Sequence, residues 1–165
     1  KNPQMRTMLL ALGAACAAVA ITSATAQNEA PDKSSDIAWM NAQQAYLSGL
    51  KAEDGWNSMD GGLRWRFVDY TGNDRKPTVA DTVTVHYGGT FIDGETFDSS
   101  FDRGEPAIFP LGRLVKAWQM AIPEMGVGDT IEIAAPADLA YGPMGKGPIP
   151  GGATLLFTVK LIDIE

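Results

Sequence analysis

The chain has few of the side chains that most often carry enzyme chemistry. Its 165 residues include one histidine, His86, and one cysteine, Cys16. A single histidine excludes a metal site built from several imidazoles. Residues 27–165 contain no cysteine, so disulfides cannot stabilise this part of the chain in any redox compartment.

Positive charge is also scarce. Lysine and arginine number 13 against 20 acidic residues, and the formal net charge is −7. An acidic chain without a basic stripe is a poor partner for nucleic acids and for anionic membrane surfaces. Lys146 lies in a glycine-rich segment, but that segment lacks the spacing of a phosphate loop and the Ser or Thr after its lysine. We therefore expect no metal, no cofactor, no nucleic-acid partner and no stable membrane association.

Long apolar runs are limited to one, at residues 8–21. Arg6 supplies a positive charge before it, and the small residues Ala24-Thr25-Ala26 follow it. This is the layout of a cleavable secretory signal, and the run is short for a membrane-spanning helix. We assign residues 1–26 to the signal, with residues 1–4 as extra residues ahead of a start methionine.

Cleavage after this signal would leave Gln27 as the first residue of a periplasmic or secreted protein. It would remove two positive charges, Lys1 and Arg6, and no acidic residue, so the net charge would move from −7 to −9. The alternative is a lipid anchor on Cys16. Against it, Gly13 stands where a lipobox usually has leucine.

Residues 27–62 are expected to form a flexible leader, a short helix and a linker. Ser35 or Asp36 can cap a helix that runs to about Ser48, and Gly49 can end it. One short helix favours a packing arm over a long dimerisation stalk. The turn-rich stretch after it, residues 53–62, is expected to be the linker.

Alternation of apolar and polar residues then predicts half-buried strands. Residues 63–67 alternate in this way, and in residues 82–87 one face carries Val83, Val85 and Tyr87. Asp93-Gly94 predicts a two-residue hairpin turn after the second strand. Later strands are predicted around residues 131–133 and 155–161.

One helix is predicted between these strands, from Arg113 to Ile122. Its apolar residues recur at helical spacing, and Pro123 closes it. An antiparallel sheet with one short central helix is an α+β design.

Single aromatic residues stand at wide intervals in this half of the chain: Tyr87, Phe97, Trp118, Tyr141 and Phe157. Each could simply build the core. Together, with a Pro/Gly loop after Tyr141, they indicate an apolar ligand pocket with few polar groups.

Two polar residues near this set have open interpretations. Asp98 follows Phe97 and has Arg103 five residues on. It is either part of a surface turn with a weak ion pair or an acceptor at the pocket rim, held by Tyr87 or Arg103. His86 falls on the strand face opposite Tyr87 and has no nucleophile beside it in sequence, which favours a structural or surface role.

Three segments together resemble the FKBP (macrolide-binding immunophilin) family of peptidyl-prolyl cis–trans isomerases. They read VTVHYGGTFIDGETFDSSFDRGEP, FPLGRLVKAWQMAIPEMGVGD and ADLAYGPMGKGPIPGGATLLFTVKLIDIE. The resemblance covers residues 82–165, and we extend the domain to residues 63–165. The family fold is a strongly bent antiparallel sheet wrapped around a short α-helix. With its signal and helical arm, the chain looks like a bacterial exported member.

The resemblance also implies which residues form the site. Trp118 would be the floor of the pocket, and Tyr141 and Asp98 would reach the bound substrate or macrolide. The walls would be Tyr87, Phe97, Leu114, Val115, Ile149 and Phe157. We also expect Arg103 to be a substrate-binding residue. The chain departs from the family pattern at Ala107, where some members have a pocket phenylalanine, and in a shorter segment 111–118 and late loop. We expect these departures to affect macrolide affinity more than isomerase activity.

The expected activity needs no nucleophile. The barrier to rotation about an X–Pro bond, about 18–20 kcal/mol, comes from amide resonance, and a pocket that favours the twisted amide lowers it. The expected partners are proline-containing unfolded polypeptides and macrolide inhibitors. The alternative function is a folding chaperone or peptide-binding module that uses the same groove with little turnover.

Overall fold

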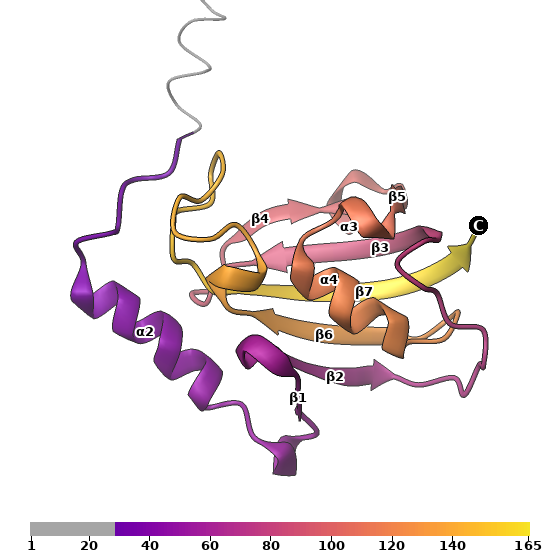
Figure 1. Ribbon diagram of the computed structural model, residues 1–165. Coiled ribbons are helices and arrows are strands. Elements are labelled where there is room, and N and C mark those ends of the chain that lie inside the picture. The colour runs from indigo at the N-terminus through magenta and orange to yellow at the C-terminus, as the bar shows by residue number, and fades with distance from the viewer. Residues whose placement is uncertain (1–28) are drawn as a thin grey trace, which may run out of the picture.

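The computed structural model describes residues 29–165 (Figure 1). The expected signal, its cleavage site and Cys16 lie outside the described residues. The α-helices are α2 (Ile37–Ser48), α3 (Ser100–Arg103) and α4 (Lys116–Ala121). The strands are β1 (Asn57–Ser58), β2 (Arg64–Asp69), β3 (Thr82–Thr90), β4 (Thr96–Ser99), β5 (Ala107–Pro110), β6 (Thr130–Ala135) and β7 (Leu155–Ile164).

The strands form one antiparallel sheet in the order β1-β2-β6-β7-β3-β4, with β5 also paired to β3. The short helix α4 lies across one face of this sheet (Figure 1). The predicted α+β architecture, an antiparallel sheet around a short helix, is confirmed.

The core lies between α4 and the sheet. Val83, Val85 and Tyr87 are buried on one face of β3, as the period-2 pattern predicts. Ala117, Trp118 and Ala121 of α4 join them. Each large apolar side chain buried here contributes about 1.5–3 kcal/mol to folding, so this face holds the helix against the sheet.

The β3–β4 hairpin differs from the two-residue turn expected at Asp93-Gly94. Phe91 N donates to Glu95 O at 2.9 Å, and Gly94 N donates to Phe91 O at 3.0 Å. The loop therefore has three residues, Ile92, Asp93 and Gly94. Gly94 has φ 91°, the left-handed conformation that closes a three-residue hairpin and that glycine adopts without strain.

The predicted helix at Arg113–Ile122 is wrong at its start. Leu111–Arg113 form a 3₁₀ turn, and Leu114 and Val115 are extended with ψ of 172° and 150°. Helix α4 therefore begins only at Lys116. The extended pair places two apolar side chains beside α4 instead of within its first turn.

Helix α2 packs against the sheet domain as an arm, over nearly the predicted range. Asp36 caps it by accepting from Trp39 N at 2.9 Å. Gln43 is buried, and its Oε1 accepts from Thr154 N at 2.9 Å while its backbone O accepts from Thr154 Oγ1 at 3.2 Å. These two bonds join the arm to the segment that enters β7. The leader is joined too, because Ala30 N donates to Gly147 O at 2.9 Å.

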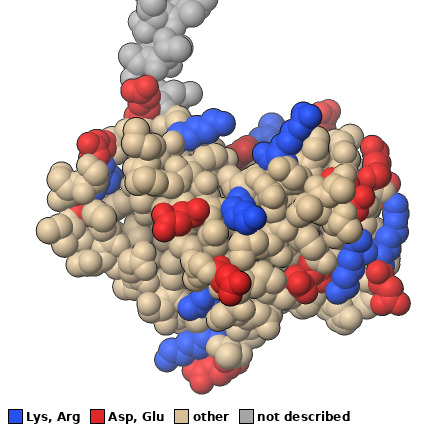
Figure 2. Space-filling view, viewed as in Figure 1, with Lys and Arg blue, Asp and Glu red and all other residues tan. Residues whose placement is uncertain are grey.

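Charged side chains of both signs are intermixed on the face shown in Figure 2, without a patch of one sign. Within residues 29–165, no helix has the length and apolar character needed to cross a membrane. In the same range, His, Cys, Asp and Glu side chains form no group of three that could hold a metal ion.

Candidate active site

A cavity of about 220 Å³ opens beside α4 on the face of the sheet that the helix covers. It is smaller than the roughly 300–1,000 Å³ of drug-sized ligand pockets, so it suits one or two side chains of a polypeptide. Its lining residues come from β3, β4, β5, the α4 region, β7 and the Pro/Gly loop at residues 141–150, which we call the late loop. They are Tyr87, Phe97, Asp98, Phe109, Leu114, Val115, Trp118, Tyr141 and Phe157.

Trp118 is the centre of the aromatic lining. It is 4% exposed, and its indole meets the rings of Tyr87 and Phe157 edge to face at centroid distances of 5.2 and 5.4 Å. The ring of Phe109 lies 6.2 Å away in a similar orientation. Edge-to-face contacts between aromatic rings are favourable beyond simple burial, so they stabilise the arrangement of the lining.

Gly89 allows Phe97 to take its place in the wall. A Cβ atom on Gly89 would lie 2.5 Å from Cζ of Phe97 and 3.2 Å from a ring carbon of Phe157. Any larger residue in β3 would push Phe97 out of position. The sequence analysis did not single out Gly89, because the need for a glycine appears only when the strands are paired.

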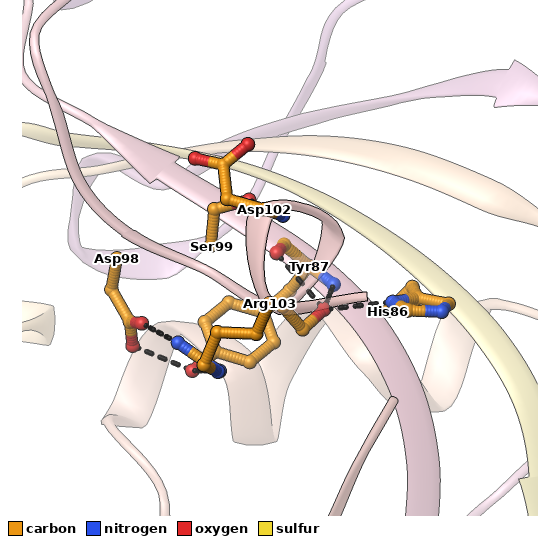
Figure 3. Close-up of polar contacts among 7 residues, drawn as sticks. His86, Tyr87, Asp98, Ser99, Asp102 and Arg103 are labelled. Atoms are coloured by element: carbon orange, nitrogen blue, oxygen red, sulfur yellow. Dashed lines mark hydrogen bonds and ion pairs between the residues drawn. The ribbon is translucent and has the colours of Figure 1, made fainter. Parts of the chain in front are cut away.

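The polar side of the cavity is a closed network of three side chains (Figure 3). The Tyr87 hydroxyl donates to Asp98 Oδ2 at 2.5 Å, and Arg103 Nη1 donates to Asp98 Oδ1 at 2.5 Å. Arg103 Nη2 also donates to the Tyr87 oxygen at 3.0 Å. Of the two interpretations of Asp98, the geometry agrees with an acceptor at the rim held by both Tyr87 and Arg103.

This network sets the charges in the cavity. Burial opposes ionisation of Asp98, but the hydrogen bonds from Tyr87 and Arg103 outweigh it and hold the pKa of Asp98 below its usual range. Burial and the Asp98 carboxylate raise the pKa of the Tyr87 hydroxyl. Asp98 is therefore an anion at neutral pH and Tyr87 is a neutral donor. The Asp98 and Arg103 side chains are 42% and 52% exposed, so solvent screens their attraction.

Tyr141 lies on the late loop and lines the cavity. Burial, with a smaller effect of Asp98, raises the pKa of its hydroxyl. This hydroxyl stays protonated at neutral pH. It can therefore donate a hydrogen bond to a ligand carbonyl.

The short helix α3, which lies between β4 and β5 in the sequence, supports Tyr87. Strand β3 pairs with β5 through Val85 and with β4 from Gly88 onward. In the gap, the Ser100 hydroxyl accepts from Tyr87 N at 2.7 Å, lies 3.2 Å from Tyr87 O, and lies 3.0 Å from Nδ1 of His86. The same helix, α3, carries Arg103. One turn of helix thus holds both the backbone and the hydroxyl of Tyr87.

Three further placements concern the expected site residues. Arg103 does not line the cavity and acts through Asp98 and Tyr87. Ile149 is not on this cavity either: it is 7% exposed in the core and faces a hollow next to the leader. His86 stacks on Phe101 at 4.9 Å, away from the lining.

Ala107 stands where some family members have a pocket phenylalanine, but a phenylalanine is present two residues later in this chain. Phe109 lines the cavity, and its ring lies 5.9 Å from that of Tyr87. The sequence analysis missed it. The usable signal was the alternation of β5, in which residues two apart share a face.

Comparison with known proteins decides the family. The family model for the FKBP-type peptidyl-prolyl cis–trans isomerase domain matches residues 73–162. The chain belongs to this family. Residues 73–162 include every residue that lines the cavity, so the cavity lies within the FKBP-type domain.

Bacterial and fungal relatives agree with this assignment. The chain is 43% identical over 122 residues to the FKBP-type peptidyl-prolyl cis-trans isomerase FkpA of Aeromonas hydrophila, covering 74% of this chain and 45% of that protein. It is 42% identical over 120 residues to the FKBP-type 22 kDa isomerase of Escherichia coli, covering 72% and 58%. For FK506-binding protein 2 of Emericella nidulans the values are 47% over 95 residues, 56% and 70%.

Solved structures show the same fold. The crystal structure of FkpA from Escherichia coli superimposes with a TM-score of 0.75 at 34% identity, covering 92% of this chain and 68% of that one. The chain spans about half the length of the curated bacterial relatives it matches, for example 45% of the Aeromonas protein and 58% of the 22 kDa Escherichia coli protein.

Proposed function

We propose that this domain accelerates cis–trans rotation about X–Pro peptide bonds in exported polypeptides. The observation that carries the proposal is the cavity itself: a small aromatic pocket whose one carboxylate is already held by two donors. Such a site can bind and orient a proline-containing segment but has no group poised to attack it. Membership of the isomerase family supports this reaction.

The mechanism rests on transfer of the amide from water to the aromatic cavity. The planar amide carries charge separation through resonance, and the twisted amide at the top of the barrier carries less. Water stabilises the planar form more, so an apolar cavity lowers the barrier of about 18–20 kcal/mol. Only the interactions that are stronger with the twisted form contribute to the rate.

The polar groups have orienting roles in this mechanism. The Tyr141 hydroxyl donates to a substrate carbonyl and holds it while the bond rotates. Asp98 keeps the Tyr87 ring in the wall through a bond of 2.5 Å and presents a negative field to the amide nitrogen side. Because Asp98 is bound by Tyr87 and Arg103, proton transfer is no part of the proposed step.

The floor offers one further contact for a bound amide. Trp118 Nε1 is buried and has no hydrogen-bond partner within residues 29–165. A buried donor without a partner costs about 1–3 kcal/mol. A carbonyl oxygen of a bound substrate is an acceptor of the kind that would satisfy it.

The test is a protease-free isomerisation assay with tetrapeptides of the form Ala-Xaa-Pro-Phe. We expect acceleration over buffer, greatest when Xaa is apolar because Leu114, Val115 and the aromatic rings form the wall. Activity should persist after exhaustive chelation. No acceleration with any Xaa at micromolar protein would refute the proposal.

The same cavity is proposed to bind macrolides of the FK506 class. The support is the name of one relative, FK506-binding protein 2, and the aromatic ring that Phe109 adds to the cavity lining two residues after Ala107. Stoichiometric inhibition of the isomerase assay by FK506 is the expected result. We also propose that the protein acts after export, on the strength of the signal predicted at residues 1–26.

A further inference from the structure

A second hollow, which we name the arm groove, lies between helix α2, the tip of the β3–β4 hairpin and the late loop. Its volume is about 400 Å³, within the range of ligand pockets. Its lining includes Trp39 of α2, Phe91, Ile92 and Asp93 of the hairpin, and Pro148 and Pro150 of the late loop.

The walls of the arm groove are mainly apolar. Trp39, Phe91 and Ile92 are half-buried, so each ring or aliphatic chain presents part of its surface to the hollow. Pro148 and Pro150 add two apolar rings and no backbone N–H. This surface suits apolar side chains of a bound polypeptide better than a polar small molecule or an added strand.

The arm groove is a neighbour of the active-site cavity, because aromatic rings that line the two hollows are in contact. Phe91, in the groove, has its ring centroid 5.0 Å from that of Phe97. Phe97, in the cavity wall, lies 5.9 Å from Phe157. An extended chain advances about 3.3–3.6 Å per residue. A chain whose proline occupies the cavity can therefore reach the groove with a few flanking residues.

Contacts between α2 and residues 152–154 hold the arm groove in shape. The two bonds between Gln43 and Thr154 attach α2 to the segment after the late loop. A Cβ on Gly152 would lie 3.5 Å from the Trp39 ring, so the indole packs closely on that loop. A client segment would thus bind a surface that is already ordered, which limits the entropy cost of binding.

The charges at the rim favour one kind of occupant. Asp93 and Glu95 line the hairpin side and Lys33 the leader side, so acidic groups exceed basic ones. From this charge, the apolar walls and the proximity of the cavity, we propose that the arm groove binds an apolar segment of the client polypeptide, with basic rather than acidic neighbours, whose proline lies in the cavity. This inference rests on the proposed isomerase function.

The experiment compares a long and a short substrate on the full chain. The long substrate is a 15-residue peptide with a central Leu-Pro, apolar residues on both sides and two lysines. The short one is the Ala-Leu-Pro-Phe tetrapeptide. The variant is Ile92→Asp, at a turn position that accepts polar residues, and its matched control is Ile108→Asp. Ile108 is 60% exposed on β5 and lies outside the groove lining.

We expect Ile92→Asp to lower kcat/KM for the long peptide about tenfold, a loss equal to one buried apolar contact. The loss should appear in KM. The tetrapeptide should be turned over as by the wild type, and Ile108→Asp should change neither substrate. Replacing the two peptide lysines by glutamates should weaken the wild type toward the level of the variant.

Two results would overturn the inference. An unchanged kcat/KM for both substrates in Ile92→Asp would assign the groove to the chain's own leader or to no ligand. Equal losses with both substrates would mean that Ile92 acts through the cavity. If the wild type accelerates neither substrate, the proposed function fails, and fluorescence anisotropy of the labelled 15-residue peptide still decides the groove: binding must be lost in Ile92→Asp and kept in Ile108→Asp.

Discussion

Replacing Ser100 by alanine should destabilise the protein more than its small size suggests. Ser100 is fully buried, and its hydroxyl fills the gap in β3 pairing beside Tyr87. The hydroxyl accepts from Tyr87 N and donates to Tyr87 O, and the direction of its bond with His86 Nδ1 depends on the imidazole tautomer. At least two hydrogen bonds are therefore lost at once.

The magnitude follows from the group left behind. The Tyr87 N–H would lose its bond of 2.7 Å to Ser100 Oγ at a buried position. A buried donor left without a partner costs about 1–3 kcal/mol. That is a large part of the roughly 5–15 kcal/mol that stabilises a typical domain. Because Tyr87 lines the cavity, kcat/KM should also fall several-fold in conditions where the variant is folded.

The assay is urea unfolding of Ser100→Ala beside Ser48→Ala. Ser48 is exposed at the end of α2, where its Oγ donates to Gln44 O at 3.1 Å. The control removes the same atom and also a hydrogen bond, but water can replace that bond, so its effect should stay within about 0.5 kcal/mol. The midpoint for Ser100→Ala should drop with an unchanged slope. Equal midpoints for the two variants would show that the hydroxyl does not support the Tyr87 backbone.

Three further outcomes are expected. Phe97→Ala should lower kcat/KM more than tenfold, because it opens the wall to water. Tyr141→Phe removes one hydrogen bond worth about 0.5–1.5 kcal/mol and should lower kcat/KM only several-fold. The control is Phe101→Ala, which removes an exposed ring outside the cavity and should change kcat/KM little. The pH profile of kcat/KM should be flat between about pH 6 and 8. Despite burial, the bonds from its neighbours keep the pKa of Asp98 in the folded protein below the ordinary 3.8. The contribution of ionised Asp98 to folding stability is therefore present above pH 3.8 and is lost only as the pH falls through the folded pKa. A steep change of kcat/KM between about pH 6 and 8 that disappears in Asp98→Asn would instead mean acid–base catalysis. N-terminal sequencing of protein from the extracytoplasmic fraction should find Gln27 first; a lipid on Cys16 would contradict this.

The sequence by itself determined the elements whose signals are local. The alternation in residues 82–87 correctly assigned Val83, Val85 and Tyr87 to the buried face, because side-chain direction in a strand has a period of two. The cap at Asp36 and the stop at Gly49 bounded α2, since both act within one helical turn. The family resemblance pointed to most of the cavity lining from residue identities alone.

Only the tertiary structure decided the features that depend on distant partners. Apolar residues at helical spacing could not show that Leu114 and Val115 are extended, because a short run fits a helix or a cavity wall equally well. Phe109 reaches the cavity through its register opposite Val83. The need for a serine at position 100 arises from a gap between two strand pairings. The arm groove depends on a bond between residues 111 positions apart, Gln43 and Thr154. Local patterns cannot determine such contacts, because they form only after separate elements pack together.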